Sequence, residues 1–158
     1  WEKMSHLIKP EEKDFISETP DAEQQNAWVY QYVDSICYGA ELLGDPAAIP
    51  LLKRIHESPL LNNQSVSEGI QADFAFERRS VVELTLGRSL AHLGSPKGYE
   101  VLISYLNDNR ATLSNFAFMT LEQLTGLNLK RNPELWKRFL MDNKDLLKPI
   151  PLLKRVDG

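Results

Sequence analysis

Two stretches of this chain decide its fold: Leu43-Gly44-Asp45-Pro46 and, 50 residues later, Leu93-Gly94-Ser95-Pro96. In each stretch the glycine can adopt the left-handed backbone conformation that ends a helix. A residue that can cap a helix follows the glycine, and a proline then suits the first position of the next helix. Each stretch therefore predicts two helices joined by a very short turn.

Apolar residues recur every three or four positions around both turns, which is the spacing of amphipathic helices. Before the first turn, after a helix start at Thr19-Pro20, the stripe comprises Val29, Val33, Ile36, Ala40 and Leu43. After that turn it comprises Ile49, Leu52 and Ile55. Around the second turn the inward positions are Phe74, Val82, Leu86, Leu90 and Leu93, then Tyr99, Leu102, Ile103 and Leu106.

A third, looser copy follows. Asp108 or Asn109 is expected to cap a helix that ends at Gly126, and Asn132-Pro133 then starts another. Their inward positions are Leu113, Ala117, Leu121 and Leu124, then Leu135, Trp136, Phe139 and Leu140. The pattern predicts an all-α protein, an α-α superhelix of about three stacked antiparallel helix pairs, because one pair alone buries too little.

The turn and the helix start that follows it, Leu43 to Leu52, resemble HEAT and PBS-lyase-like HEAT repeats over residues 28–142. The chain departs from that pattern at the insertion 57–72 and where Ser95 and Asn132 replace the aspartate. Leu86 to Arg110 is also similar to HEAT-type tails of larger bacterial proteins, some FAD-dependent oxidoreductases among them. This chain has no Gly-x-Gly-x-x-Gly fingerprint, so we expect no cofactor.

The repeats divide the chain into an N-terminal extension (1–18), a helical repeat domain (19–142) with an insertion loop at 57–72, and a C-terminal tail (143–158). The insertion is rich in turn-forming residues, and loops of this length are often functional or mobile. The two prolines of the tail favour an extended segment or short turn over the end of the stack. Because the chain opens on Trp1, we expect a piece of a longer protein.

The composition indicates a water-soluble globular domain. The chain has 158 residues, 42% hydrophobic and 25% charged, and no apolar run long enough to cross a bilayer, so no membrane partner is expected. Its first ten residues lack the apolar middle section of a signal peptide. The compartment stays open.

No catalytic or metal site is expected. The three histidines are scattered, and Cys37 is the one cysteine. Cys37 lies beside an inward stripe and is expected to be a small buried residue. Asp73, Glu77 and Glu83 alternate with Arg78, Arg79 and Arg88, which we interpret as ion pairs along one helix.

The predicted function is a non-catalytic interaction scaffold, which binds a protein partner or other domains of the same chain. The second helix of each pair should present the positions between its inward stripes. These partner-binding candidates are Lys53, Arg54, Glu57, Glu100, Ser104, Lys137 and Arg138. Among the aromatic residues, Tyr30 or Phe118 is a candidate for an exposed contact.

Two alternatives stay open. The chain can be an accessory C-terminal module of a larger enzyme, such as an FAD-dependent oxidoreductase. It can also be a nucleic-acid-binding helical-repeat protein or glycosylase, because basic residues gather after Lys130. Because the chain carries a net charge of -4, nucleic acid is the less favoured partner.

Overall fold

A computed structural model describes residues 20–68 and 74–150 of the chain. Over these ranges it contains no strand. The α-helices are α2 (Pro20–Leu43), α3 (Ile49–His56), α4 (Phe74–His92), α5 (Pro96–Ser104), α6 (Ala111–Thr125) and α7 (Pro133–Asn143). Short 3-10 helices, η3 (Pro46–Ala48) and η4 (Lys144–Leu146), precede α3 and follow α7. The predicted all-α class is confirmed.

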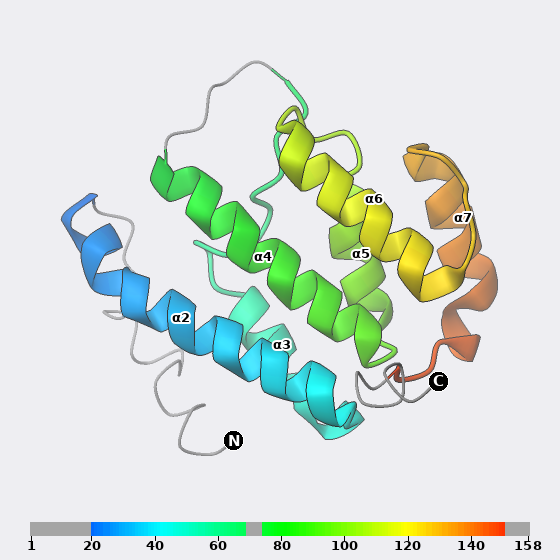
Figure 1. The fold of residues 1–158 in the computed structure, drawn as a ribbon, viewed down its shortest axis with the longest axis horizontal. Coiled ribbons are helices and arrows are strands. Elements are labelled where there is room, and N and C mark those ends of the chain that lie inside the picture. The colour runs from blue at the N-terminus through cyan, green and yellow to red at the C-terminus, as the bar shows by residue number, and fades with distance from the viewer. Residues whose placement is uncertain (1–19, 69–73, 151–158) are drawn as a thin grey trace.

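The helices stack as three consecutive pairs, α2 with α3, α4 with α5 and α6 with α7. Helices α2, α4 and α6 lie side by side, and α3 and α5 lie behind them (Figure 1). Helix α4 is central and packs against α2, α3, α5 and α6, while α5 also packs against α7. None of the helices in the described ranges combines the length and apolarity that a membrane span requires.

Left-handed glycines end the first helix of each pair, as the sequence predicts. The φ angles are 64° at Gly44, 86° at Gly94 and 72° at Gly126. Asp45 accepts a hydrogen bond from the amide of Ala47, and Asn132 caps α7 through its side chain. Ser95 has the extended backbone of a cap, but its side chain makes no capping hydrogen bond to α5.

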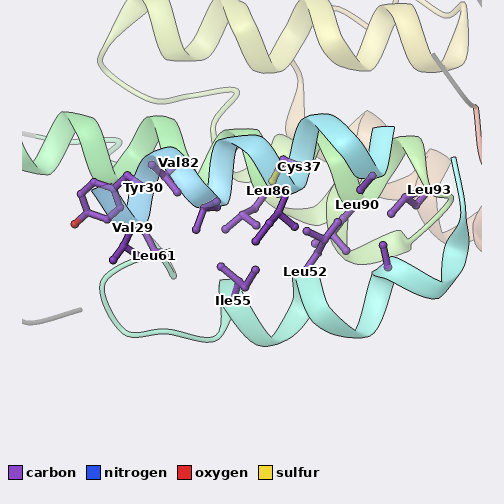
Figure 2. Close-up of a cluster of buried hydrophobic side chains, with 14 residues drawn as sticks. Val29, Tyr30, Cys37, Leu52, Ile55, Leu61, Val82, Leu86, Leu90 and Leu93 are labelled. Atoms are coloured by element: carbon purple, nitrogen blue, oxygen red, sulfur yellow. The ribbon is translucent and has the colours of Figure 1, made fainter. Parts of the chain in front are cut away.

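The core consists of two clusters. The first lies between α2, α3 and α4, where Leu52 and Ile55 of α3 point toward side chains of α2 and α4 (Figure 2). The second lies between α4, α5, α6 and α7. Trp136 is fully buried there, and its indole N–H donates to the carbonyl of Lys130 at 2.7 Å. Each cluster draws on two neighbouring pairs, so each pair buries part of its apolar surface against the next.

Four sequence predictions are wrong in detail. Leu43 and Leu135 are expected inside but are 61% and 39% exposed. Leu43 is the last residue of α2, and of the adjacent pair Leu135 and Trp136, both predicted to point inward, only Trp136 is buried. Tyr30, one of the two candidates for an exposed aromatic contact, is 1% exposed. Helix α6 begins at Ala111 with Arg110 as its cap, not Asp108 or Asn109.

Helices α4 and α5 approach each other at two glycines. A Cβ atom on Gly98 would overlap the backbone nitrogen of Ala91 and lie 2.7 Å from its Cα atom. A Cβ atom on Gly87 would lie 2.6 Å from Val101 Cγ1. Real Cβ atoms do not come this close to backbone atoms, so the absence of a side chain at Gly98 permits this helix crossing.

Parts of the predicted extension, insertion and tail lie outside the described residues, namely 1–18, 69–72 and 151–158. In the described part of the tail, the amide of Ile150 donates to the carbonyl of His92 at 2.6 Å. The tail thus passes over the turn between α4 and α5, close to Gly94.

Candidate functional site

The second helices of the three pairs form one face of the molecule, which we call the second-helix face and define by the outward side chains of α3, α5 and α7. All seven partner-binding candidates are exposed on it. Lys53, Arg54 and Glu57 belong to α3 and its C-terminal cap, Glu100 and Ser104 to α5, and Lys137 and Arg138 to α7.

One part of this face is an open groove of about 700 Å³ between α5 and α7, here called the apolar groove. Its lining residues are Ser67, Glu100, Ile103, Ser104, Asn107, Pro133, Glu134, Lys137, Leu140 and Met141. Ile103 and Leu140 are buried, whereas Met141 is 78% exposed. An exposed methionine beside buried apolar side chains is an adaptable contact surface.

The adjoining part is a second hollow of about 380 Å³, here called the basic hollow. Its lining residues are Lys53, His56, Glu57, Pro96, Lys97, Glu100 and Lys144. Glu100 lines both hollows, so they are neighbours along α5.

The structure therefore brings five of the seven candidates together. Lys53, Glu57 and Glu100 share the basic hollow, and Glu100, Ser104 and Lys137 share the apolar groove. Arg54 and Arg138 line neither hollow.

Sequence reasoning missed several lining residues. Lys97 and Met141 lie three and four positions from Glu100 and Lys137, so helical spacing alone could have found them. Helical spacing could not have found the other three. Lys144 lies beyond the end of α7, His56 is a buried position of α3, and Ser67 belongs to the insertion.

Ion pairs on this face are short-range ones. Lys97 Nζ lies 3.6 Å from Glu100 and Lys137 Nζ lies 3.4 Å from Glu134, each pair three residues apart on one helix. Their side chains are largely exposed, so these pairs contribute little to stability and can rearrange when a partner binds.

A buried carboxylate, Glu83 of α4, lies beneath the basic hollow. It accepts hydrogen bonds from His56 Nε2 at 2.7 Å and from the Tyr105 hydroxyl at 2.6 Å. The backbone amides of Asn63 and Gln64 also donate to it, at 2.9 and 2.8 Å. Burial alone raises the pKa of Glu83, but the hydrogen bonds from His56, Tyr105 and Gln64 outweigh it and lower that pKa. Glu83 thus joins α3, α5 and the insertion to α4.

A second buried carboxylate, Asp108, holds the insertion two residues further along, at Val66. It accepts from the amide of Val66 at 2.9 Å and from the guanidinium of Arg110 at 2.7 Å. Arg110 in turn donates to the Gln64 carbonyl and to Ser80 Oγ, at 2.9 and 2.8 Å. Burial alone raises the pKa of Asp108, but the hydrogen bonds from Arg110 and the Val66 amide outweigh this effect. The pKa of Asp108 is therefore lowered. The described part of the insertion, residues 57–68, is therefore tied to the repeat core.

The charges of α4 also differ from the prediction. Arg88 pairs with Glu41 at 2.8 Å and Arg78 with Asp34 at 3.2 Å, both across to α2. Glu83 pairs with His56 of α3. The interpretation of these residues as ion pairs along one helix is thus wrong for Glu83, Arg78 and Arg88, because the partners come from neighbouring helices. Asp73 lies outside the described residues.

The buried polar groups leave few reactive atoms open. Both oxygens of Glu83 accept hydrogen bonds from the protein. The described ranges hold no group of three or more His, Cys, Asp or Glu side chains placed for a metal ion. Cys37 is fully buried, as predicted, and burial raises the pKa of its thiol to about 12.

Among the described residues, the exposed aromatic side chains lie on α2. Trp28 and Tyr32 are exposed and pack edge to face at 5.6 Å, and Tyr38 is exposed on the same helix. Phe118 of α6, the other aromatic candidate, is half-buried with the Arg131 guanidinium 5.3 Å from its ring centre.

Comparison with protein-family models, with curated proteins and with solved structures found no match to this chain.

Proposed function

We propose that this chain is a non-catalytic interaction module of the HEAT-repeat kind, whose second-helix face binds a segment of a protein partner or another domain of the same polypeptide. The observation that carries the proposal is the apolar groove between α5 and α7, about 700 Å³ in volume and continuous with the basic hollow.

The groove has the size and the chemistry of a binding site. Its volume lies within the roughly 300 to 1,000 Å³ of ligand-binding clefts. Ile103, Leu140 and Met141 supply apolar surface, and charged and polar side chains such as Glu134 and Lys137 surround it. An apolar centre with a polar rim is typical of protein interfaces.

The buried networks support the proposal, because they hold α3, the end of α5 and the insertion in place against α4. Glu83 connects His56 of α3 to Tyr105 at the end of α5. Asp108 and Arg110 hold the insertion, which contributes Ser67 to the groove. A binding surface that is rigid before the partner arrives loses less conformational entropy on binding.

The test is affinity capture with the immobilised chain, comparing the unchanged protein with Met141→Glu. A partner seated in the groove would have to bury the new carboxylate, so this change should abolish or strongly reduce recovery of the captured partner. Met119→Glu is the matched control, since Met119 is 57% exposed on α6, outside the second-helix face.

A triple change of Lys53, Arg54 and Arg138 to alanine probes the rest of the face. We expect it to weaken capture, with unchanged circular dichroism and unfolding midpoint. Capture that survives both Met141→Glu and the triple change would place the interface elsewhere and overturn the proposal.

The interdomain form of the proposal makes this chain an accessory module of a larger enzyme. If the coding sequence upstream of Trp1 encodes an enzyme domain, cross-links from that domain should reach Lys53, Lys97 or Lys137. Cross-links that reach only lysines outside these hollows, such as the exposed Lys130 before α7, would contradict this form.

A further inference from the structure

Three lysines from separate elements line the basic hollow. Lys53 comes from α3, Lys97 from the first turn of α5 and Lys144 from η4, which follows α7. These residues are distant in sequence, so only the stacking of the three pairs brings the three lysines around one hollow. Like charges repel at such sites unless an anion balances them.

The hollow carries one excess positive charge. This count takes the lining side chains alone, which include three lysines and the two glutamates Glu57 and Glu100. The buried carboxylate of Glu83 is not among them, and it is already held by His56 and Tyr105. Lys97 is already paired with Glu100 at 3.6 Å. Within the described ranges Lys53 and Lys144 form no ion pair, so they are available to an incoming anion.

The first turn of α5 adds to this positive character. Pro96 and Lys97 line the hollow, and the side chain of Ser95 makes no capping hydrogen bond there. Helix N-termini carry partial positive charge and favour nearby carboxylates. This contribution supplements the lysines, which come from three elements.

We propose that the basic hollow recognises a carboxylate side chain of the partner, while the apolar groove takes a large apolar side chain of the same segment. The preferred partner is therefore a peptide segment that contains an Asp or Glu and, a few residues before or after it, a large apolar residue such as Leu, Ile or Phe. One excess positive charge matches one carboxylate better than a phosphate dianion, which Glu57 and Glu100 would repel. This inference rests on the proposed binding role of the second-helix face.

The test is selection from a phage-displayed library of random peptides about twelve residues long, followed by fluorescence anisotropy on the synthesised winners. Peptides selected on the unchanged chain should be enriched in Asp and Glu and in large apolar residues. Lys53→Glu and Lys144→Glu should each weaken their binding by about fivefold or more, and added salt should weaken binding to the unchanged chain. Lys130→Glu, at the turn before α7, is the matched charge control and should leave affinity unchanged.

The outcomes separate the inference from the proposed function. Peptides that bind with no acidic preference, yet lose binding in Met141→Glu, would overturn the carboxylate assignment and keep the groove. Peptides whose affinity is unaffected by Met141→Glu and by both lysine reversals would overturn both. Stronger binding of a phosphoserine version than of the carboxylate version would reassign the hollow to phosphate and also overturn this inference.

Discussion

The imidazole of His56 on α3 and the carboxylate of Glu83 on α4 meet at 2.7 Å beneath the second-helix face. His56 lines the basic hollow, and Glu83 also accepts from Tyr105 and from two amides of the insertion. This one contact therefore connects the candidate surface to the inner helix layer. A change at Glu83 should affect stability, and through it the shape of the surface.

Replacing Glu83 with alanine should lower the free energy of unfolding by about 3 to 5 kcal/mol, because several buried donors lose their acceptor. Urea denaturation followed by circular dichroism measures this change. Glu77→Ala, an exposed position on the same helix, should cost well under about 1 kcal/mol. Equal losses for both variants would show that Glu83 has no special role.

Acid should weaken the fold through the same group. The pKa of Glu83 lies below its ordinary value of 4.5 in the folded protein. Its contribution is therefore fully present above about pH 4.5 and disappears as the pH falls through the lower folded-state pKa. Asp108 has a lowered pKa and acts in the same direction. The urea concentration at the unfolding midpoint should therefore fall as the pH is lowered from 7 to 3. The Glu83→Gln variant should show a weaker pH dependence. An equally steep fall in Glu83→Gln would contradict the role of Glu83 in acid sensitivity.

Gly98→Ala should destabilise the protein by about 1 to 3 kcal/mol, because the new methyl group would meet the backbone of α4 at Ala91 and Gly87. Thermal unfolding measures the shift. Gly39→Ala is the matched control, since a Cβ atom there meets nothing within 4 Å. Gly39 lies inside α2, where alanine is the better helix former, so this control should stabilise by about 0.5 to 1 kcal/mol. A neutral Gly98→Ala would mean that α4 and α5 can separate at little cost.

The thiol of Cys37 should react slowly with Ellman's reagent at pH 8. It is fully buried, and burial raises its pKa to about 12, so the nucleophilic thiolate is scarce. In concentrated urea the same thiol should react within the mixing time. Fast reaction of the native protein, at the rate of the urea-treated one, would contradict the burial of Cys37.

Local patterns predicted much of the fold. The glycines at 44, 94 and 126 adopt positive φ angles because that requirement belongs to the turn itself. The stripe from Val29 to Ala40 and that from Val82 to Leu93 are buried as their spacing indicates. The predictions for Leu43 and Leu135 were wrong because apolar spacing does not show how far the neighbouring helix extends. The prediction for Tyr30 was wrong because only the packing of the helices decides which aromatic side chain points inward.

The candidate surface was predicted in part. The seven residues chosen from helical positions are exposed on the second helices, but spacing did not reveal the two hollows that five of them line. Lys144 and Ser67 join these hollows through contacts between segments far apart in sequence. The carboxylates of Glu83 and Asp108 were missed for the same reason, since their partners lie on other elements.

The sequence by itself determined the helices, their turns and the faces that are buried, because those depend on interactions within a few residues. Only the tertiary structure decided that Glu83 meets His56, that the insertion is tied to Asp108 and Arg110, and that three distant lysines line one hollow. These contacts depend on how the helix pairs stack, and the stacking is decided by the packing of the two core clusters, whose members come from helices far apart in sequence.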